Sequence, residues 1–454
     1  MTSQTPDPSS PQSTAQQDTG AQIPSAESEV VGICRELIRF DTQNWGGNTA
    51  RPERPAAERI AEWFTEVGLD SEIFESSPGR ASLVARIPGS DPGLPALVVH
   101  GHTDVVPADA AEWAVDPFSA EERDGLIWGR GAVDMKDMDA MIIAVVRNYL
   151  RTGLRPRRDL IIAFFADEEA GGTYGARWMV ENHPHLFTDA TEAVSEVGGY
   201  SVDLRGQRVY LVQTAEKGIA WLKLVARGTA GHGSQINEDN PVTKLAAAVA
   251  RIGAHAWPEQ LPQATEDLLR GVSDITGVPF GAETYPELLA ELGSVAKFVG
   301  ATLRNTSNPS LLSAGYKHNV IPSTAEALID CRTLPGEHDA LMRTVRELAG
   351  SDVEVLTEIE APALEAPFSG RLVDTMTTSL LAEDPGARVL PYTLSGGTDN
   401  KSLAALGIHG YGFAPLRLTG DLDFPAMFHG VDERVPVSAL TFGTRVLHRF
   451  LLEA

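Results

Sequence analysis

The stretch Leu160-Ile-Ile-Ala-Phe-Phe-Ala-Asp-Glu-Glu-Ala-Gly-Gly172 places two neighbouring glutamates directly after a run of apolar residues. The run 160–166 is short and uninterrupted, which is typical of a strand buried on both faces of a sheet. Glu168 and Glu169 therefore emerge at a strand end, where mutual repulsion and loss of solvation both cost free energy. This strand end is the first candidate for a functional site.

The segments around this strand predict a larger α/β domain. Apolar residues recur with helical spacing between residues 27 and 67, strand-like runs follow at 82–87 and 96–100, and a helical segment lies near 134–152. Strands that alternate with helices indicate a sheet covered on both faces, which makes three layers. The last part of the chain, residues 363–454, is expected to return to this sheet.

A second unit is indicated by a change of pattern. Residues 220–227 alternate as a half-exposed strand does, and 240–255 form an amphipathic helix with Asn240 as a plausible N-cap. Beyond a long acidic segment at 257–295, further elements are predicted: strands near 309–316, 324–332 and 352–359, and a helix at 337–349. The order βαββαβ predicts a small ferredoxin-like module inserted into the larger fold.

These patterns divide the chain into four parts. Residues 1–26 have hardly any large apolar side chain and are predicted to be a disordered tail. Residues 27–215 and 363–454 are predicted to form the larger domain, and 216–362 the inserted module.

Composition narrows the class of protein. The chain has 454 residues, with 62 acidic and 37 basic residues and a net charge of -25, which opposes binding to nucleic acid or to an anionic membrane. Its two cysteines, Cys34 and Cys331, provide neither a disulfide framework nor a thiolate metal site. No apolar run is long enough to span a membrane, and the first residues lack a signal-peptide pattern. We therefore expect a cytoplasmic protein.

Further polar residues follow apolar runs or glycine-rich turns. His102 and Asp104 end a strand and project to one side, although a capped strand end would look the same. Asp134 precedes a helix, where an acidic N-cap is routine, and Glu196 follows a short apolar stretch. His429 taken singly is an ordinary loop histidine. Together, oxygen and nitrogen ligands without thiolates suit zinc, manganese or cobalt, and a shared carboxylate is usual where two ions bind.

The order of several motifs makes a family resemblance specific. The motifs are HGHTD, GRGAVDMKD, ADEEAGG, SEVGG, GTAGHGS, HNVIP, DCRTLPG, SGGTDNK and FHGVDE. In this order they resemble the motifs of the M20 family of metallopeptidases, which includes aminoacylase, carboxypeptidase, succinyl-diaminopimelate desuccinylase and dipeptidase members. The resemblance runs from about residue 30 to 450. One departure is Asp137, where many relatives have glycine.

The resemblance implies a centre with two divalent metal ions, zinc in the first place and cobalt or manganese as alternatives. Five ligands are implied: His102 and Glu196 for one ion, Glu169 and His429 for the other, and Asp134 for both. Asp104 would orient His102. Glu168 would be the general base that takes a proton from water and passes it to the leaving amine. The reaction implied is hydrolysis of an amide bond.

The resemblance also implies substrate contacts on the inserted module, which matches the family's lid. His232 would stabilise the oxyanion, Asn319 would contact substrate, and Arg332 would hold a substrate carboxylate, although an ion pair with Asp330 is the alternative. The loop Ser395-Gly396-Gly397-Thr398 precedes a helix and could hold an anionic group through its backbone N–H groups. In dimeric relatives the lid histidine completes the partner's site, so a homodimer through this module is expected.

The sequence thus predicts a two-metal hydrolase that cleaves small peptides or N-acyl amino acids bearing a free carboxylate. Alternatives within the same chemistry are a dipeptidase, a desuccinylase or an N-carbamoyl amidohydrolase. A non-catalytic metal or peptide binder is a different class, and retention of Glu168 argues against it because a binder needs no general base. A serine hydrolase is disfavoured because the chain has no G-x-S-x-G motif.

Overall fold

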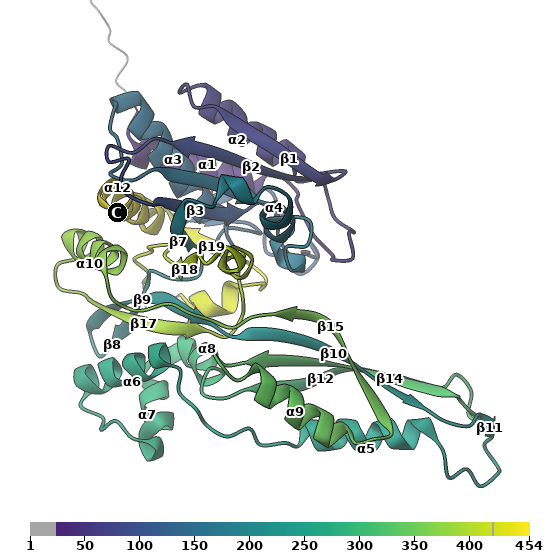
Figure 1. Cartoon of the computed structure of the whole chain (residues 1–454). Coiled ribbons are helices and arrows are strands. Elements are labelled where there is room, and N and C mark those ends of the chain that lie inside the picture. The colour runs from purple at the N-terminus through teal and green to yellow at the C-terminus, as the bar shows by residue number, and fades with distance from the viewer. Residues whose placement is uncertain (1–23, 420–421) are drawn as a thin grey trace, which may run out of the picture.

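The computed structural model describes residues 24–419 and 422–454 (Figure 1). Residues 1–23 of the predicted tail lie outside the described residues. The end of that tail is part of the fold, because helix α1 (Ala26–Ile38) starts there and the Ser25 hydroxyl caps it by accepting the N–H of Ser28 at 3.3 Å. The tail boundary predicted at residue 26 is therefore corrected to a position before Ser25.

The larger domain is built on a ten-stranded mixed sheet. Its main path runs β1-β2-β6-β3-β7-β18-β9-β16, and β8 and β17 also pair with β9. The strands are β1 (Ser71–Ser77), β2 (Arg80–Ile87), β3 (Ala96–His102), β6 (Leu160–Phe165), β7 (Ala190–Ser195), β8 (Tyr200–Leu204), β9 (Gln207–Glu216), β16 (Leu364–Glu365), β17 (Arg388–Leu394) and β18 (His409–Gly412). The predicted strands at 82–87, 96–100 and 160–166 are confirmed, and the last part of the chain does return to this sheet.

Three parallel neighbours in this sheet position the candidate site. β3 lies between β6 and β7 and pairs in parallel with both. All six residues of β6 and all seven of β3 are buried, because both faces of the sheet are covered. Since parallel strands end at the same edge of a sheet, the residues that follow β3, β6 and β7 are brought together there.

Helices cover both faces of the main sheet. Alternating residues of β3 divide between two cores: Leu97 and Val99 belong to one cluster and Val98 to the other. The first cluster includes α1, α2 (Arg54–Thr65), α3 (Lys136–Thr152), α10 (Arg371–Glu383) and α12 (Val437–Glu453). The second includes α4 (Ala176–Asn182) and α11 (Asn400–Leu403). The predicted three-layer α/β architecture is confirmed.

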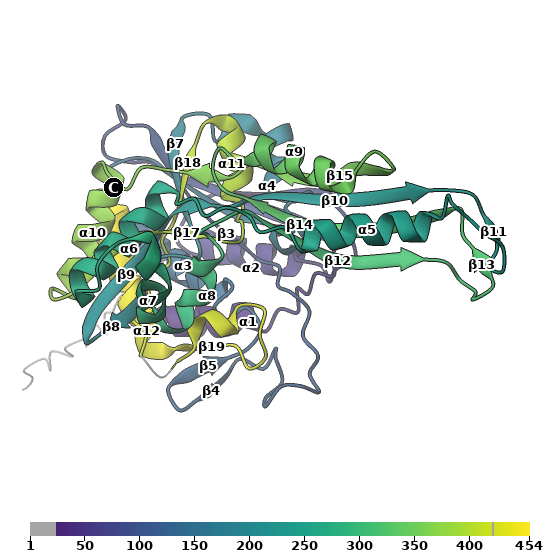
Figure 2. The same cartoon turned by 90° about the horizontal axis from the view of Figure 1, so that it is seen from below.

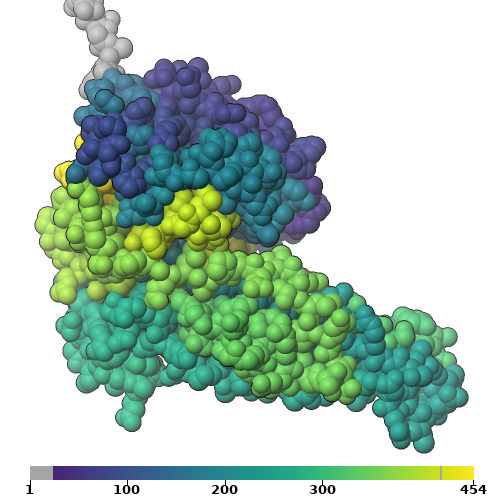
Figure 3. All heavy atoms as spheres, in the orientation of Figure 1, coloured from purple at the N-terminus to yellow at the C-terminus, as the bar shows by residue number. Residues whose placement is uncertain are grey.

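A smaller sheet forms an arm that extends from the larger domain (Figures 1 and 3). Its order is β12-β14-β10-β15, all antiparallel, with β10 (Gly218–Arg227), β12 (Thr306–Ala314), β14 (Thr324–Thr333) and β15 (Val353–Ala361). Helices α5 (Pro241–Gly253) and α9 (His338–Ala349) cover one face and share its core. They lie on the side of the small sheet away from the main sheet (Figures 1 and 2). This is the predicted βαββαβ module, and Asn240 caps α5 by accepting the N–H of Val242.

The tip of the arm carries a second, two-stranded sheet. Here β11 (Gly231–His232) pairs with β13 (Val320–Ile321). Both strands lie at the end of the arm that is farthest from the main sheet (Figures 1 and 2).

The acidic segment 257–295 packs mainly on the larger domain, although its first residue, Trp257, belongs to the core of the small sheet and donates its Nε1–H to the Ser307 hydroxyl at 3.0 Å. It forms α6 (Gln263–Thr276) and α7 (Tyr285–Glu291), followed by α8 (Ala296–Gly300). α6 contacts β17, β8 and β9. Gly271 allows this close approach, since a Cβ there would lie 2.5 Å from a methyl carbon of Leu390. The division of the chain at 216 and 362 stays a prediction, and within it this segment contributes to the main core.

A third small sheet joins residues 121–128 to a segment near the end of the sequence. β19 (Arg434–Pro436) pairs with β5 (Leu126–Trp128), which pairs with β4 (Glu121–Arg123). This pairing places the turn at 129–135 beside residues 429–433. Among the helices of residues 24–419 and 422–454, none has the length and apolar character to span a membrane.

Candidate metal centre

Four of the predicted residues follow the three parallel strands at one edge of the sheet. His102 is the last residue of β3. Glu168 and Glu169 open a short helical turn just beyond β6, and Glu196 comes directly after β7. The shared strand direction therefore explains why these side chains meet.

Two more predicted residues are brought to this edge by loops. Asp134 lies in the turn that precedes α3, and His429 follows the turn Phe424–Met427. Asp167, Val197 and His429 have positive φ angles of 66°, 57° and 59°. This conformation is costly for the β-branched Val197 in particular, and strained residues of this kind cluster at functional sites.

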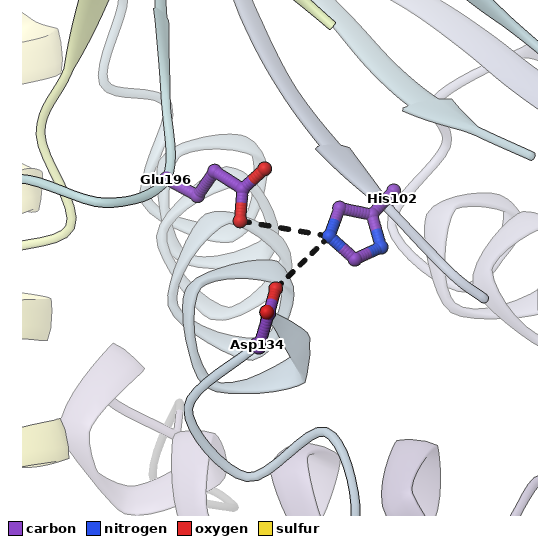
Figure 4. Close-up of side chains that lie close together, drawn as sticks. All are labelled: His102, Asp134 and Glu196. Atoms are coloured by element: carbon purple, nitrogen blue, oxygen red, sulfur yellow. Dashed lines mark hydrogen bonds and ion pairs between the residues drawn. The ribbon is translucent and has the colours of Figure 1, made fainter. Parts of the chain in front are cut away.

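His102, Asp134 and Glu196 form the first group of side chains (Figure 4). The Nε2 atom of His102 lies 3.2 Å from Asp134 Oδ1 and 3.5 Å from Glu196 Oε2. Its Nδ1 atom lies 3.0 Å from the carbonyl oxygen of Asp104, which can accept a hydrogen bond from a protonated Nδ1. In that tautomer Nε2 presents a lone pair to the space between the carboxylates.

Asp134, Glu169 and His429 form the second group. The Nε2 atom of His429 lies 3.0 Å from Glu169 Oε2 and 3.3 Å from Asp134 Oδ2. Asp134 therefore faces His102 with one oxygen and His429 with the other. The side chain of His429 is 58% exposed, so this group opens to solvent.

The protonation of these groups is strongly perturbed. Burial raises the pKa of Glu196 to about 8, and burial together with the charge of Glu196 raises the pKa of Glu168 well above its usual range. Hydrogen bonds to Asp134 and Glu169 raise the pKa of His429 to about 10. Burial alone would lower the pKa of His102, but Glu196 and other carboxylates raise it well above its usual value. The neighbouring carboxylates thus favour the protonated, positively charged forms of His102 and His429.

The two groups fit a pair of divalent cations. In each group one oxygen or nitrogen atom per residue lies within 4.8 Å of the others, and Asp134 belongs to both groups. Carboxylate and imidazole donors without thiolates suit zinc, manganese or cobalt. Two cations would supply the positive charge that the clustered carboxylates otherwise draw from protonated histidines.

The carboxylate of Asp104 holds the backbone behind the two glutamates. It accepts the N–H groups of Glu168 and Glu169 at 3.1 and 3.2 Å, whereas its closest approach to His102 Nδ1 is 3.5 Å. The Asn44 amide donates to it at 2.8 Å and to Asp167 at 3.0 Å, while Arg80 donates to Asn44. No local pattern in the sequence signals Asn44 or Arg80, because their partners are distant along the chain.

The structure does not bring His232 and Asn319 to this centre within one chain. His232 belongs to β11 at the tip of the arm, where its Nδ1 atom lies 2.8 Å from the Ser234 hydroxyl. The carbonyl of Asn319 accepts the N–H of Gly233, so both residues belong to the same tip.

Arg332 lies near the base of the arm and is already paired. Its Nε and Nη2 atoms lie 2.7 and 3.1 Å from the two carboxylate oxygens of Asp330. Cys331 belongs to the core beneath the helices, so its neighbour Arg332 lies on the opposite face, towards the main sheet. The ion pair that the sequence offered as an alternative is therefore present.

One residue of the loop Ser395-Gly396-Gly397-Thr398 contacts a carboxylate of the protein itself. Thr398 donates its backbone N–H to Glu216 at 3.1 Å and its hydroxyl at 2.6 Å. Lys401 also contacts Glu216, at 3.1 Å, and the helix that follows the loop has four residues. Both donors of Thr398 therefore bind Glu216, which lies at the junction between the main sheet and the arm.

Comparison with known proteins agrees with this geometry. The family model described as "Peptidase family M20/M25/M40" matches residues 98–453. The chain is 30% identical to N-fatty-acyl-amino acid synthase/hydrolase PM20D1 of Bos taurus, over 87% of this chain and 81% of the relative. It is 26% identical to human aminoacylase-1, over 94% of this chain and 96% of the relative.

Solved structures share the fold. A M20 family metallo-carboxypeptidase, Sso-CP2 from Sulfolobus solfataricus, superposes with a TM-score of 0.73 at 18% identity and covers 93% of this chain and 98% of its own. A Bacillus subtilis protein described as a dinuclear metal-binding peptidase of the same family has a TM-score of 0.59, at 15% identity and with coverage of 94% and 98%. From the extent of the family match, this chain belongs to peptidase family M20/M25/M40 and is a metal-dependent amidohydrolase.

Proposed function

We propose that the five clustered side chains bind two divalent cations, zinc by preference. His102 and Glu196 hold one ion, Glu169 and His429 hold the other, and Asp134 is shared. The observation that carries the proposal is the double role of Asp134, whose two oxygens lie 3.2 and 3.3 Å from histidines of different groups. A carboxylate with a histidine on either side is the arrangement that a shared metal ligand requires.

In this proposal Glu168 is the general base. Its Oε2 atom lies 4.0 Å from His102 Nε2, at the edge of the first group, while Glu169 contacts His429 directly. A carboxylate at this position can take a proton from water and later give it to the leaving amine. When bound, the cations supply Lewis-acid polarisation of the scissile carbonyl and make water easier to deprotonate.

For the substrate we propose an N-acyl amino acid with a free carboxylate. The curated relatives at 26–30% identity act, by their names, on acyl amino acids, and they align along most of this chain. The peptidases among the solved structures are 14–18% identical and support the fold. Arg332 is the residue we propose for the substrate carboxylate, once its pairing with Asp330 is shared or exchanged.

We also propose that two chains form a homodimer through the arm and that His232 serves the partner's centre. The tip of the arm is exposed and carries large apolar side chains, with Ile236 95% and Tyr316 83% exposed. Such side chains are costly to leave in water and are typical of a contact surface. Asn319 lies on the same tip and would reach the partner's centre with His232. A cytoplasmic location stays a prediction.

Hydrolysis of a defined panel tests the substrate. The protein is stripped with a chelator, reconstituted with Zn²⁺, Co²⁺ or Mn²⁺, and given N-acetyl, N-palmitoyl, N-succinyl and N-carbamoyl amino acids as well as dipeptides. We expect turnover of N-acyl amino acids only after reconstitution, because the bound cations polarise the carbonyl and activate water. Preference for dipeptides would make the chain a dipeptidase, and full turnover in verified metal-free protein would contradict the metal proposal.

A further inference from the structure

Glu433 is a fully buried carboxylate four residues beyond His429. Its Oε1 atom accepts the backbone N–H groups of Val133 at 2.7 Å and Asp134 at 3.1 Å. Its Oε2 atom accepts the N–H of Gly131 at 2.9 Å and the guanidinium of Arg130 at 2.8 Å. One side chain therefore satisfies three backbone donors and one cation in the turn that carries Asp134.

The backbone around Glu433 joins the same two segments. Its carbonyl oxygen accepts the N–H of Gly129 at 2.9 Å, and the next residue, Arg434, pairs with Trp128 in the small sheet formed by β19 and β5. The turn at 129–134 is thus held by main chain at its start and by the Glu433 carboxylate along its length. Because the contacts begin four residues after His429, the segment that carries one ligand also fixes the loop that carries another.

From these contacts we propose that Glu433 is a positioning residue. It fixes the position of the Asp134 carboxylate relative to both metal ions and to His429. The inference rests on the proposed metal-binding function. Asp134 faces both groups, so a displacement of its loop moves an oxygen away from each ion at once. His429, in contrast, belongs to one group.

The chemistry of the contacts requires a carboxylate at this position. Each oxygen of Glu433 accepts from two donors, and hydrogen bonds to an ionised acceptor are stronger than neutral ones. An amide of the same shape would direct its NH₂ group at two donors in either orientation, so those N–H groups would lose their partner. The loop would then leave the position in which Asp134 reaches both groups.

Metal affinity of a Glu433→Gln variant tests the proposal without reference to turnover. Zinc and cobalt binding are measured by equilibrium dialysis against a competing chelator, and the visible spectrum of bound Co²⁺ reports the coordination geometry. We expect both ions to bind about 10–100-fold more weakly, which is the usual loss when a residue supporting a ligand is replaced. His429→Ala should instead weaken one ion selectively.

Asp432→Asn is the matched control. It makes the same chemical change at the neighbouring residue, whose carboxylate accepts the N–H of Ala114 and does not contact the 130–134 turn. We expect it to bind both ions as the wild type does. An equal loss in this control would overturn the specific role of Glu433.

Several outcomes separate this inference from the proposed function. Wild-type affinity for both ions in a folded Glu433→Gln protein would overturn the positioning role, and so would weakening of one ion only. Failure of the wild type itself to bind two ions would overturn the metal proposal on which the inference rests. If Glu433→Gln does not fold, Arg130→Gln removes one donor to the same carboxylate, and a smaller but parallel weakening of both ions is expected.

Discussion

Glu168 and Glu169 are adjacent in sequence, but their side chains have different surroundings. Glu169 lies 3.0 Å from His429 and also accepts the N–H of Val106, whereas Glu168 is 4.0 Å from His102 Nε2. Asp104 holds the backbone N–H groups of both. A rigid backbone with two differently placed carboxylates is suited to a division of roles, with Glu169 as ligand and Glu168 as base.

Replacement of Glu168 by glutamine tests this division. We expect Glu168→Gln to retain both metal ions and to lower kcat by about 10²–10⁴-fold, because the amide is nearly isosteric but cannot accept a proton. Metal content and turnover are measured on the same preparation. Glu169→Gln is the comparison and should lose metal. Loss of an ion from Glu168→Gln would show that the two roles are reversed or shared.

Arg332 and Asp330 give a second prediction at the scale of single residues. Arg332→Ala should raise KM for substrates with a free carboxylate by about 10–100-fold, since a contact to a charged group contributes about 1.5–3 kcal/mol. It should leave KM for the corresponding amides nearly unchanged. Asp330→Asn should lower KM for the acids, because the amide keeps only one acceptor oxygen and no charge, which frees one of the two Arg332 donors that now contact Asp330. Equal effects on acids and amides would assign the pair to structure.

At the scale of elements, the junction between β9 and β10 is held by buried charged side chains. Lys217 lies between these strands and donates to the carbonyl oxygens of Ala301 and Arg304 at 2.9 and 2.7 Å. Lys401 donates to the carbonyl oxygens of Lys217 and Pro362, which stand at the two crossings between the main domain and the arm. The orientation of the arm therefore depends on a few contacts at its base.

Burial of Lys217 predicts a dependence of stability on pH. Burial lowers the pKa of Lys217 to about 7 in the folded chain, while an unfolded lysine titrates near 10.4. Between these values the unfolded chain binds more protons, so the free energy of unfolding rises with pH by up to about 1.4 kcal/mol per unit. We expect Lys217→Met to remove this rise between about pH 7 and 10, as measured by urea unfolding of metal-free protein.

The same substitution at the exposed Lys297 is the control and should leave the slope as in the wild type. Identical slopes in Lys217→Met and the wild type would mean that Lys217 is not the source of the dependence.

The elements also show how far the sequence can predict this molecule. The meeting of His102, Glu169 and Glu196 was predictable in part, because these residues lie at the ends of apolar runs that form parallel neighbours. Their roles as metal ligands came from the family resemblance and stay a proposal. The packing of α6 was not predictable, since an amphipathic helix shows that one face is buried but not which sheet buries it. The contact between Thr398 and Glu216 joins residues 182 positions apart, and no local pattern encodes such a pairing.

At the scale of the whole molecule, the arm separates His232 from the metal centre of its own chain. The strand that contains His232 lies at the end of the arm, beyond the main domain (Figures 1 and 2). A closed twofold dimer would bring each tip to the partner's centre, so both centres would be completed by one arrangement.

Mixing two inactive variants tests this arrangement. Glu168→Ala and His232→Ala chains are dissociated, mixed and reassociated in equal amounts. If His232 acts across the dimer, each heterodimer has one centre with both native residues, and random pairing makes about half of the dimers heterodimers. Activity should then recover to at most about a quarter of the wild type. Activity that stays at the level of the single variants after verified reassociation would place His232 in its own chain or outside the reaction.

The late position of β18 and His429 along the chain determines the order in which the protein can be assembled during synthesis. β18 inserts between β7 and β9, so the edges of both strands lack this partner until residue 412 has been made. The first group of side chains is complete at Glu196, whereas the second needs His429, more than two hundred residues later. Contacts so distant in sequence form slowly, and an open strand edge invites association with other chains. The nascent polypeptide can thus gather the first group of side chains early, but its sheet and its second group are complete only when nearly all of it has been translated.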